Sequence, residues 1–228
     1  MPKTQKGPNY EAEFISAIRS NVNTVLDLLD LKDSGLEKRI GTFASRFDFA
    51  VDAVEKHIRN DEMFRAVFAK DPGKQKIHEN IAAAFIKRLQ GVKNFKQLGH
   101  NALVIFRGLV DSRKNVRKSG AMSTAKTIDF VWECQGGKTV YASHKYTKES
   151  GGGQDNQYRD LQEFIREARE SNLKNTYFLA IADGPYYQTN DFGSNSTKMQ
   201  HLKNLANGRN TFALSTDELA GWLRRFCK

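Results

Sequence analysis

The sequence predicts an α/β protein whose second half forms a mixed β-sheet and whose first half is mainly helical. Three observations support this fold class. Apolar residues recur at helical spacing up to about residue 112, two strand-like runs flank a Gly-Gly pair further on, and a continuous apolar run follows at 176–182. The second half thus has the order β-β-α-β, then a loop, a strand and a helix. We expect a helical region over residues 1–112 and an α/β core over residues 113–228, joined in one integrated domain.

The first half contains two long series of apolar residues at steps of three and four positions, the spacing that places side chains on one face of a helix. These series cover residues 14–29 and 36–58, and Ser34 before the second is a candidate N-cap. Further helices are expected over 77–89 and 95–110. The sequence predicts no strand in this half.

A β-hairpin is expected around Gly136-Gly137. Residues 127–134 and 139–147 are rich in β-branched and aromatic side chains, which favour strands, and the Gly-Gly pair between them favours a tight turn. Antiparallel pairing across this turn would place Asp129 opposite His144.

Local signals define the remaining elements. Residues 150–153 (Ser-Gly-Gly-Gly) predict a flexible loop, and a helix with one apolar face is expected from Asp155 onward. The apolar run at 176–182 is typical of a strand that is buried on both faces. A short strand at 211–214 precedes a last helix, which begins with the capping-box pattern of residues 215–218.

The composition is that of a globular protein, with 39% hydrophobic and 27% charged residues in a chain of 228. No run approaches the roughly 18–20 apolar residues that a membrane-spanning helix needs, and the first residues lack the apolar stretch of a secretory signal. The two cysteines, Cys134 and Cys227, have no CxxC spacing, which disfavours a disulfide scaffold and a cysteine-rich zinc site. We therefore expect a reduced, cytoplasmic protein without a membrane partner.

The net charge of +10, from 36 Lys and Arg against 26 Asp and Glu, indicates a polyanionic partner such as nucleic acid. The segment between Ser112 and Ile128 has no acidic residue and contains five basic ones: Arg113, Lys114, Arg117, Lys118 and Lys126. It is interpreted either as a solvated linker or as a segment that contacts DNA phosphates. Phosphate contacts would add salt-dependent affinity without sequence preference.

The predicted hairpin brings a carboxylate and an ammonium group together. Side chains alternate along a strand, so Ser143 and Lys145 share a face, and Asp129 on the neighbouring strand lies within reach of a diagonal contact if its side chain points to that face. A carboxylate can hold Mg²⁺, which polarises a phosphate, while a lysine can orient or deprotonate the attacking water and stabilise developing charge. The alternative interpretation is an ordinary solvated cross-strand pair.

The arrangement resembles the PD-(D/E)xK nuclease superfamily, and in particular its type II restriction endonucleases. In that superfamily an Asp begins one strand and an acid-x-Lys motif follows on the next; the matching residues here are Ile128-Asp129 and Ser143-His144-Lys145. The resemblance covers roughly residues 125–226 and includes the Gly-rich stretch 145–160 and the turn at 183–187. It implies a restriction-endonuclease-like sheet core, Mg²⁺ as the cofactor and double-stranded DNA as the substrate.

Ser143 stands where the superfamily usually has the acid of acid-x-Lys. The resemblance to a Ser-x-Lys subset implies that the following helix supplies the second carboxylate, with Asp160 as the first candidate and Asp155 or Glu163 as alternatives. Asp155 equally fits the role of a helix cap. The residues that the resemblance implies for catalysis are therefore Asp129, Ser143, Lys145 and Asp160.

Two further carboxylates are candidates for the metal site. Glu133 shares a strand face with Asp129 but lies nearer the turn. Glu37 matches the superfamily's habit of bringing a Glu from an early helix toward the metals. A Glu in the first turn of a helix is also what the helix dipole favours, so this residue has a purely structural interpretation too.

Polar side chains around the predicted site are expected to contact DNA. His144 points away from Ser143 and Lys145 and is expected to be either packed in the core or directed toward DNA. Asn, Gln and Arg can read base edges in the major groove, which makes the polar loop over 188–210 a candidate for sequence recognition. The expected DNA contacts are Arg113, Lys114, Arg117, Lys118, His144, Lys148, Gln154, Asn156, Gln188 and Asn190.

The resemblance implies a type II restriction endonuclease that cleaves double-stranded DNA at a short palindrome. Because both strands must be cut, a symmetric homodimer is the expected assembly. A cognate DNA methyltransferase would be a functional partner without binding the protein. The alternatives are a non-catalytic DNA-binding protein in which Ser143 marks lost chemistry, a repair or junction nuclease on the same core, and a helical protein-interaction module.

Overall fold

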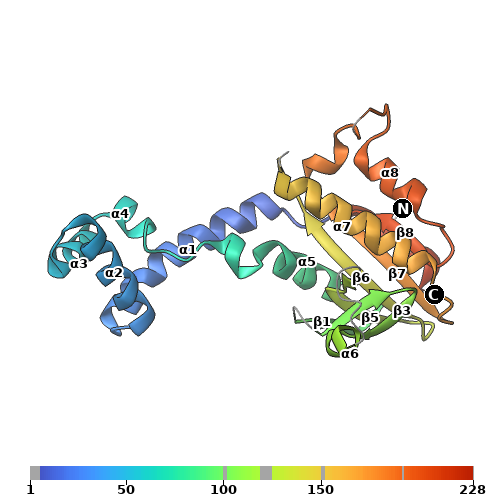
Figure 1. Ribbon diagram of the computed structural model, residues 1–228, viewed down its shortest axis with the longest axis horizontal. Helices are drawn as coiled ribbons and strands as arrows, with labels where there is room; N and C mark the ends of the chain where they lie inside the picture. Colours follow the sequence, from blue (N-terminus) through green and yellow to red (C-terminus); the bar gives the residue numbers. More distant parts are fainter. Residues whose placement is uncertain (1–5, 100–101, 119–124, 150–151, 192, 228) are drawn as a thin grey trace. The chain divides into compact units, whose positions relative to one another are not determined.

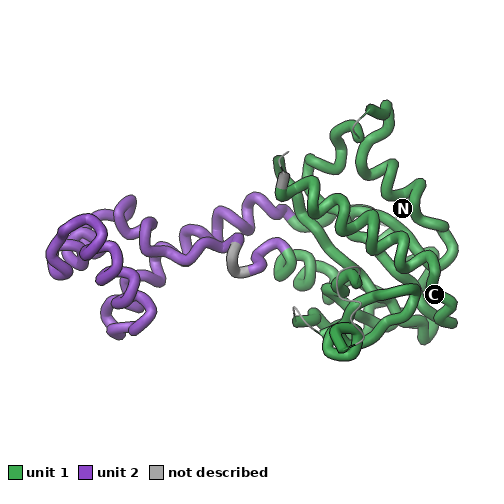
Figure 2. The backbone as a smooth tube through the Cα atoms, viewed as in Figure 1, with its two compact units in different colours: residues 1–8, 79–228 green, residues 9–78 purple. Residues whose placement is uncertain are grey.

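The computed structural model describes residues 6–99, 102–118, 125–149, 152–191 and 193–227. The chain divides into two compact units, one of residues 9–78 and one of residues 1–8 with 79–228 (Figure 2). We call them the helical unit and the α/β unit. Residues 79–112, which the sequence analysis grouped with the helical region, belong to the α/β unit.

The helical unit encloses its own apolar core, in which Val25, Leu36, Ile40 and Ile58 are at most 1% exposed. The second apolar series of the sequence is divided between two helices, because Asp48 adopts a left-handed conformation (φ 56°) that ends the first of them. The helices of this unit are α1 (Tyr10–Asp30), α2 (Ser34–Phe47), α3 (Val51–Asn60), α4 (Glu62–Ala66) and the 3₁₀ helix η1 (Pro72–Gln75), followed by the start of α5 (Ile77–Lys87).

The α/β unit contains a mixed five-stranded sheet and a separate three-stranded sheet (Figure 1). The larger sheet has the order β1 (Val92–Gln97), β5 (Phe130–Cys134), β6 (Thr139–Tyr146), β7 (Thr176–Asp183) and β8 (Thr211–Leu214). The smaller sheet has the order β3 (Leu109–Ser112), β2 (Leu103–Phe106) and β4 (Lys126–Thr127). The first three strands of the larger sheet are antiparallel and the last three are parallel, so the predicted mixed sheet is confirmed.

Helix α7 (Gly152–Arg169) makes the crossover from β6 to the parallel strand β7 and lies along both strands (Figure 1). A core of buried residues, including Leu161, Phe164 and Phe178, fills the space between this helix and the sheet. The predicted order β-β-α-β is thus present. The other elements of the unit are α6 (Arg113–Lys118), the 3₁₀ helix η2 (Pro185–Gln188), α8 (Lys198–Leu205) and α9 (Thr216–Phe226), which begins with the predicted capping box.

The prediction of a helix over 95–110, and of no strand in the first half, is wrong. This stretch forms β1, β2 and the start of β3. Strands β2 and β3 are joined by Arg107-Gly108, where both φ angles are positive (47° and 73°), as in a type I′ hairpin turn. The four apolar residues of β2 fit a helix or a strand equally well by periodicity, and the tight turn after them determines the strand.

The predicted β5–β6 hairpin is present, but its register differs by one residue. The turn contains three residues, 135–137, because the Cys134 N–H donates to the Lys138 carbonyl (2.7 Å) and Gly137 is left-handed (φ 75°). Phe130 therefore pairs with Ala142. The same register places Asp129 opposite Ser143, where the sequence analysis placed it opposite His144.

The two cysteines are bonded to each other, which the sequence analysis did not expect. Cys134 at the end of β5 and Cys227 directly after α9 form a disulfide, with their Cα atoms 4.9 Å apart. They are separated by 93 positions in the sequence, and a pair at such a distance has no spacing signature of its own. The expectation of reduced cysteines is corrected accordingly.

Two predicted segments are described only in part. In the basic segment after Ser112, residues 119–124 lie outside the described residues, and in the Gly-rich loop Ser150 and Gly151 do so. Gly152 and Gly153 of that loop already belong to α7. Among the helices of the described ranges, none is both long and apolar enough to cross a membrane.

Gly184, directly after β7, has φ 103°, and a Cβ there would lie 2.2 Å from the Thr147 carbonyl oxygen. We expect Gly184→Ala to lower the free energy of unfolding by about 2–4 kcal/mol. The strain of a positive φ angle at alanine and the cost of displacing the Thr147 main chain both contribute to this loss. Gly137→Ala is the matched control: its φ is also positive, but no described atom lies within 4 Å, so it should cost only about 1–2 kcal/mol. Urea unfolding followed by circular dichroism measures both, and equal losses would contradict the close contact.

Candidate active site

Asp129 lies between β4 and β5 and is held by hydrogen bonds on both sides. Its N–H donates to the Ala142 carbonyl and its carbonyl accepts from the Leu98 N–H, each at 2.8 Å. Its carboxylate oxygen Oδ2 accepts from the His144 N–H (2.8 Å) and from the Ser143 hydroxyl (3.2 Å). The carboxylate is therefore fixed against β6, beside Ser143.

Lys145 shares a strand face with Ser143 and Thr147 because side chains alternate along β6. The Thr147 hydroxyl donates to the side-chain oxygen of Gln157 on α7 (3.0 Å), which identifies this face as the one that α7 covers. Lys145 is half-buried and forms no hydrogen bond or ion pair through its side chain with any other residue in the described ranges. A fixed carboxylate and an unpaired ammonium group thus lie along one face of the sheet.

The three acids predicted from α7 make other contacts. The Lys126 ammonium group on β4 lies 3.2 Å from the Asp160 carboxylate and also pairs with Glu163. Burial lowers the pKa of Lys126, but the hydrogen bonds and charges of Glu163 and Asp160 outweigh it, so the pKa is raised. Asp155 accepts a hydrogen bond from the Tyr186 hydroxyl. No described contact joins any of these acids to Asp129.

The rotation of α7 about its axis explains why the predicted acids of this helix do not contact Asp129. Gln157, whose side chain is an amide, is the residue of this helix that bonds to Thr147, directly after β6. The residues predicted from this helix were carboxylates, and neither Gln157 nor Thr147 was among the predicted site residues. The only available signal was their spacing: Thr147 continues the alternation of Ser143 and Lys145, and Gln157 lies one helical turn before the buried Leu161.

The two remaining acid candidates lie elsewhere. Glu133 accepts a hydrogen bond from the Asn94 side chain on β1 (2.8 Å) and is exposed near the turn. Glu37 lies in the first turn of α2, in the helical unit, and its approach to the metal site stays a prediction.

Asp129 is the carboxylate of this site that could bind Mg²⁺. Within the described ranges, no three His, Cys, Asp or Glu side chains form a group that could hold a metal ion. Mg²⁺ keeps several waters and is commonly bound by one or two carboxylates together with substrate phosphates. The donor set around Asp129 therefore fits a Mg²⁺ ion only if waters and DNA phosphate oxygens complete its shell.

A buried polar network supports the site from the opposite face of the sheet. The His144 ring nitrogen Nε2 lies 3.2 Å from the Asp183 carboxylate, and both residues are about 5% exposed. The other Asp183 oxygen accepts from the N–H (2.9 Å) and the hydroxyl (3.1 Å) of Thr216 at the start of α9. His144 was expected either to pack in the core or to point toward DNA, and its burial agrees with packing in the core. Its main-chain N–H meanwhile orients Asp129.

A polar cavity of about 580 Å³ lies between α7, η2 and the start of α8. It is lined by Asp155, Tyr158, Arg159, Gln162, Tyr186, Asn190, Asp191 and Lys198. Burial raises the pKa of Tyr158, Tyr186 and the neighbouring Tyr187, and nearby carboxylates add to the effect, so all three stay neutral. Asn190, one of the predicted DNA contacts, lines this cavity.

The predicted DNA contacts differ in exposure. Arg113 is half-buried, and the other three cations of α6 are exposed. Gln154 near the start of α7 is half-buried. His144 is buried. The other predicted contacts are exposed: Lys148, Asn156, Gln188 and Asn190.

The basic excess belongs entirely to the α/β unit. Residues 9–78 contain 11 Lys and Arg and 12 Asp and Glu, so of the 36 and 26 in the whole chain the α/β unit contains 25 and 14. The helical unit has a net charge of −1 and the α/β unit one of +11. The unit that contains Asp129 and Lys145 is thus the one suited to a polyanion.

Comparison with protein-family models, curated protein sequences and solved structures gives no significant match. The class of the protein therefore rests on its own architecture, which consists of a helical unit and an α/β unit with a mixed five-stranded sheet and a three-stranded sheet.

Proposed function

We propose that the protein is a Mg²⁺-dependent endonuclease of double-stranded DNA, of the type II restriction class. The observation that carries the proposal is the fixed Asp129 carboxylate and the unpaired Lys145 on one sheet face, in a unit with a charge of +11. The β-β-α-β order and the mixed sheet support a restriction-endonuclease-like core.

The residues of the site have separate roles in hydrolysis. When bound, Mg²⁺ would polarise the scissile phosphate, and Asp129 is the residue that would hold it. Lys145 orients the attacking water and stabilises the negative charge that develops on the phosphate. Ser143 and the His144 N–H keep the Asp129 carboxylate in place. Asp160, Asp155 and Glu163 have no role in this mechanism.

DNA would be bound by the basic side chains of α6 and by polar residues near the start of α7 and at or just after the end of η2. Phosphate contacts position the duplex, and amide side chains such as Asn156, Gln188 and Asn190 are suited to read base edges. Cleavage of both strands at a palindrome calls for a symmetric homodimer. A methyltransferase of the same specificity would protect the cell's own DNA, and the cytoplasm is where both would act.

A non-catalytic DNA-binding protein is the second candidate function. The observation that favours it is the single carboxylate at the site, because the acids predicted from α7 pair with Lys126 and Tyr186. In that case the α/β unit would bind DNA with the same charges and would leave it intact.

Plasmid digestion distinguishes the two functions. The wild-type protein with Mg²⁺ is expected to cut several plasmids into discrete fragments, and the pattern should be different for each plasmid. Binding in a mobility-shift assay without any cleavage would favour the non-catalytic protein. Cleavage only at branched or damaged DNA would instead indicate a repair or junction nuclease.

The charges of α6 allow a test of DNA binding that is independent of cleavage. The logarithm of the DNA-binding constant falls linearly with the logarithm of the salt concentration. The double variant Lys114→Ala, Lys118→Ala should make this slope less steep by about 2, since each lost phosphate contact removes roughly 0.9. Lys56→Ala, Lys70→Ala in the helical unit is the matched control and should leave the slope unchanged. Fluorescence anisotropy with a labelled duplex in Ca²⁺ measures the slopes, and equal slopes for all proteins would exclude α6 from the DNA interface.

A further inference from the structure

The helical unit exposes a group of large apolar side chains at the junction of α2 and α3. Phe47 is 52% exposed, Phe49 56% and Val51 45%, and Val67 after α4 is 61% exposed. Contiguous exposed apolar surface is unfavourable in water unless another molecule covers it. This face is therefore a candidate interaction surface.

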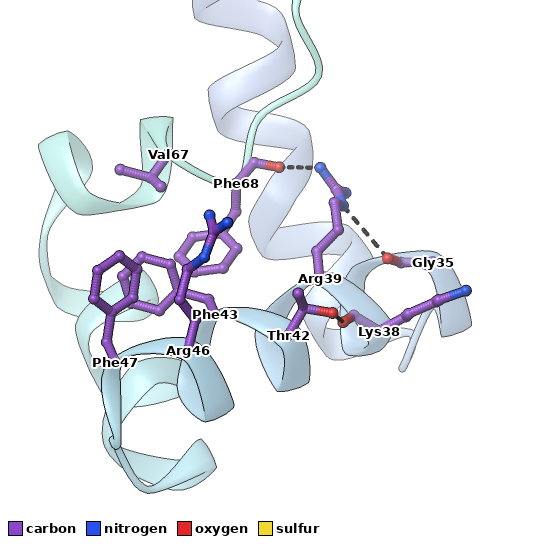
Figure 3. A pocket seen from close by; sticks show the side chains of 9 residues that line it. All are labelled: Gly35, Lys38, Arg39, Thr42, Phe43, Arg46, Phe47, Val67 and Phe68. Atoms are coloured by element: carbon purple, nitrogen blue, oxygen red, sulfur yellow. Dashed lines mark hydrogen bonds between the residues drawn. The ribbon is translucent and has the colours of Figure 1, made fainter.

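A cavity of about 360 Å³ is part of this face (Figure 3). Its apolar lining is Phe43, Phe47, Val67 and Phe68, and its charged lining is Lys38, Arg39 and Arg46. The remaining lining residues are Gly35 and Thr42, so three cations and no acid surround the cavity. This is a local asymmetry, because the helical unit as a whole contains slightly more acids than bases.

Two of the three cations are available to a partner. Arg39 is engaged, because its guanidinium group donates to the Phe68 carbonyl and to the Gly35 carbonyl (3.4 Å), as Figure 3 shows. The side chains of Lys38 and Arg46 are exposed and form no hydrogen bond or ion pair with any residue of the described ranges. Figure 3 shows the Phe43, Phe47 and Phe68 rings gathered next to Arg46.

A segment with the opposite character adjoins the cavity. Residues 48–52, Asp-Phe-Ala-Val-Asp, are all exposed and combine two acids with three apolar side chains and no cation. The Phe49 ring stacks at 6.4 Å from Phe47 and 6.3 Å from Phe43, both of which line the cavity. The apolar, cationic cavity and the apolar, acidic segment thus form one continuous face.

We propose that this face binds the same face of a second copy of the chain. A face that contains both a cationic apolar cavity and an acidic apolar segment is complementary to itself, as an isologous two-fold interface requires. Residues 48–52 of each copy would occupy the cavity of the other, with Asp52 paired with Arg46 and Phe49 against the aromatic lining. DNA is a poorer occupant, because the helical unit has no basic excess and acids adjoin the cavity.

The proposal names the partner surface of the homodimer that the proposed function calls for. The inference rests on the proposed function only for the biological role of the dimer, because dimerisation itself can be measured without DNA or Mg²⁺. A dimer without nuclease activity, or an active nuclease without this interface, would separate the two proposals.

Charge reversal in the full-length protein tests the interface. The wild type is expected to sediment as a dimer, while Arg46→Glu and Asp52→Arg alone should each raise the dimer dissociation constant at least tenfold. An equimolar mixture of these two variants should recover dimers, because in the mixed dimer one cross-interface pair has its two charges exchanged and the other keeps its native charges. Lys70→Glu, an exposed cation outside the cavity, is the matched control and should dimerise as the wild type does. Circular dichroism melts verify that every variant is folded.

Three results would overturn the proposal. These are a wild type that is monomeric at all concentrations measured, a dimer that neither substitution weakens, and variants that remain monomeric when mixed. Binding of a single-stranded oligonucleotide or an acidic peptide that depends on Arg46, with the wild type monomeric, would assign the cavity to that ligand instead.

Discussion

Asp129→Asn is expected to reduce the rate of Mg²⁺-dependent DNA cleavage by about 10³-fold or more, because the asparagine lacks the charge that holds the cation. The fold should persist, since the amide oxygen can still accept the hydrogen bond from the His144 N–H. Lys145→Met, which keeps the length of the side chain and removes its charge, should lower the rate by about 10²–10³-fold through lost stabilisation of the transition state.

Single-turnover cleavage of a labelled duplex measures these rates, and anisotropy with the same duplex shows whether DNA binding is kept. Glu149→Gln and Lys93→Met are matched controls, because they remove the same two kinds of charge from exposed positions for which no contact with DNA is proposed. They should change the rate by less than about tenfold. An Asp129→Asn protein that cleaves at the wild-type rate would exclude Asp129 from the chemistry.

Asp183→Ala is expected to lower the free energy of unfolding by about 3–5 kcal/mol, because it removes a buried carboxylate that other buried groups contact. The buried carboxylate accepts two hydrogen bonds from Thr216 and contacts the His144 ring. Its removal leaves the N–H and the hydroxyl group of buried Thr216 without this acceptor, and the contact between β7 and the start of α9 is weakened.

Urea unfolding monitored by circular dichroism measures this effect. The matched control is Asp217→Ala, directly after Thr216 in α9. The Asp217 carboxylate accepts a hydrogen bond from the Gly7 N–H at the exposed surface. We expect a loss of only about 1 kcal/mol for the control. Similar losses for the two variants would show that the Asp183 network does not stabilise the fold beyond an ordinary surface contact.

Much of the α/β unit could be predicted because its signals are local. The run Thr176–Ala182 is apolar throughout, as a central parallel strand requires, and the residues Ser215 to Glu218 have the side chains of a capping box. Strands β1 to β3 were predicted as a helix because the apolar residues of such short strands also fit helical spacing, and the Arg107-Gly108 turn that separates β2 from β3 was not recognised. The Cys134–Cys227 pair depends on the tertiary fold alone.

The candidate site could be predicted only as far as strand pairing determines it. Asp129 and Lys145 were predicted from the hairpin, and the observed register, which sets Asp129 opposite Ser143, places both residues on one face of the sheet. The second acid could not be predicted, because it depends on the rotation of α7 about its axis. The burial of Leu161 and Phe164 against the sheet determines that rotation and directs Gln157 toward Thr147.

The most direct test of the proposed site is the location of a divalent cation in a crystal of the protein with duplex DNA. Mn²⁺ in place of Mg²⁺ gives an anomalous diffraction signal that identifies the ion. We expect a peak about 2.1 Å from a carboxylate oxygen of Asp129, with a DNA phosphate oxygen in the same coordination shell and Lys145 facing that phosphate. A cation bound only elsewhere, for example at Asp160 and Glu163, or bound DNA without a cation at Asp129, would contradict the proposed site.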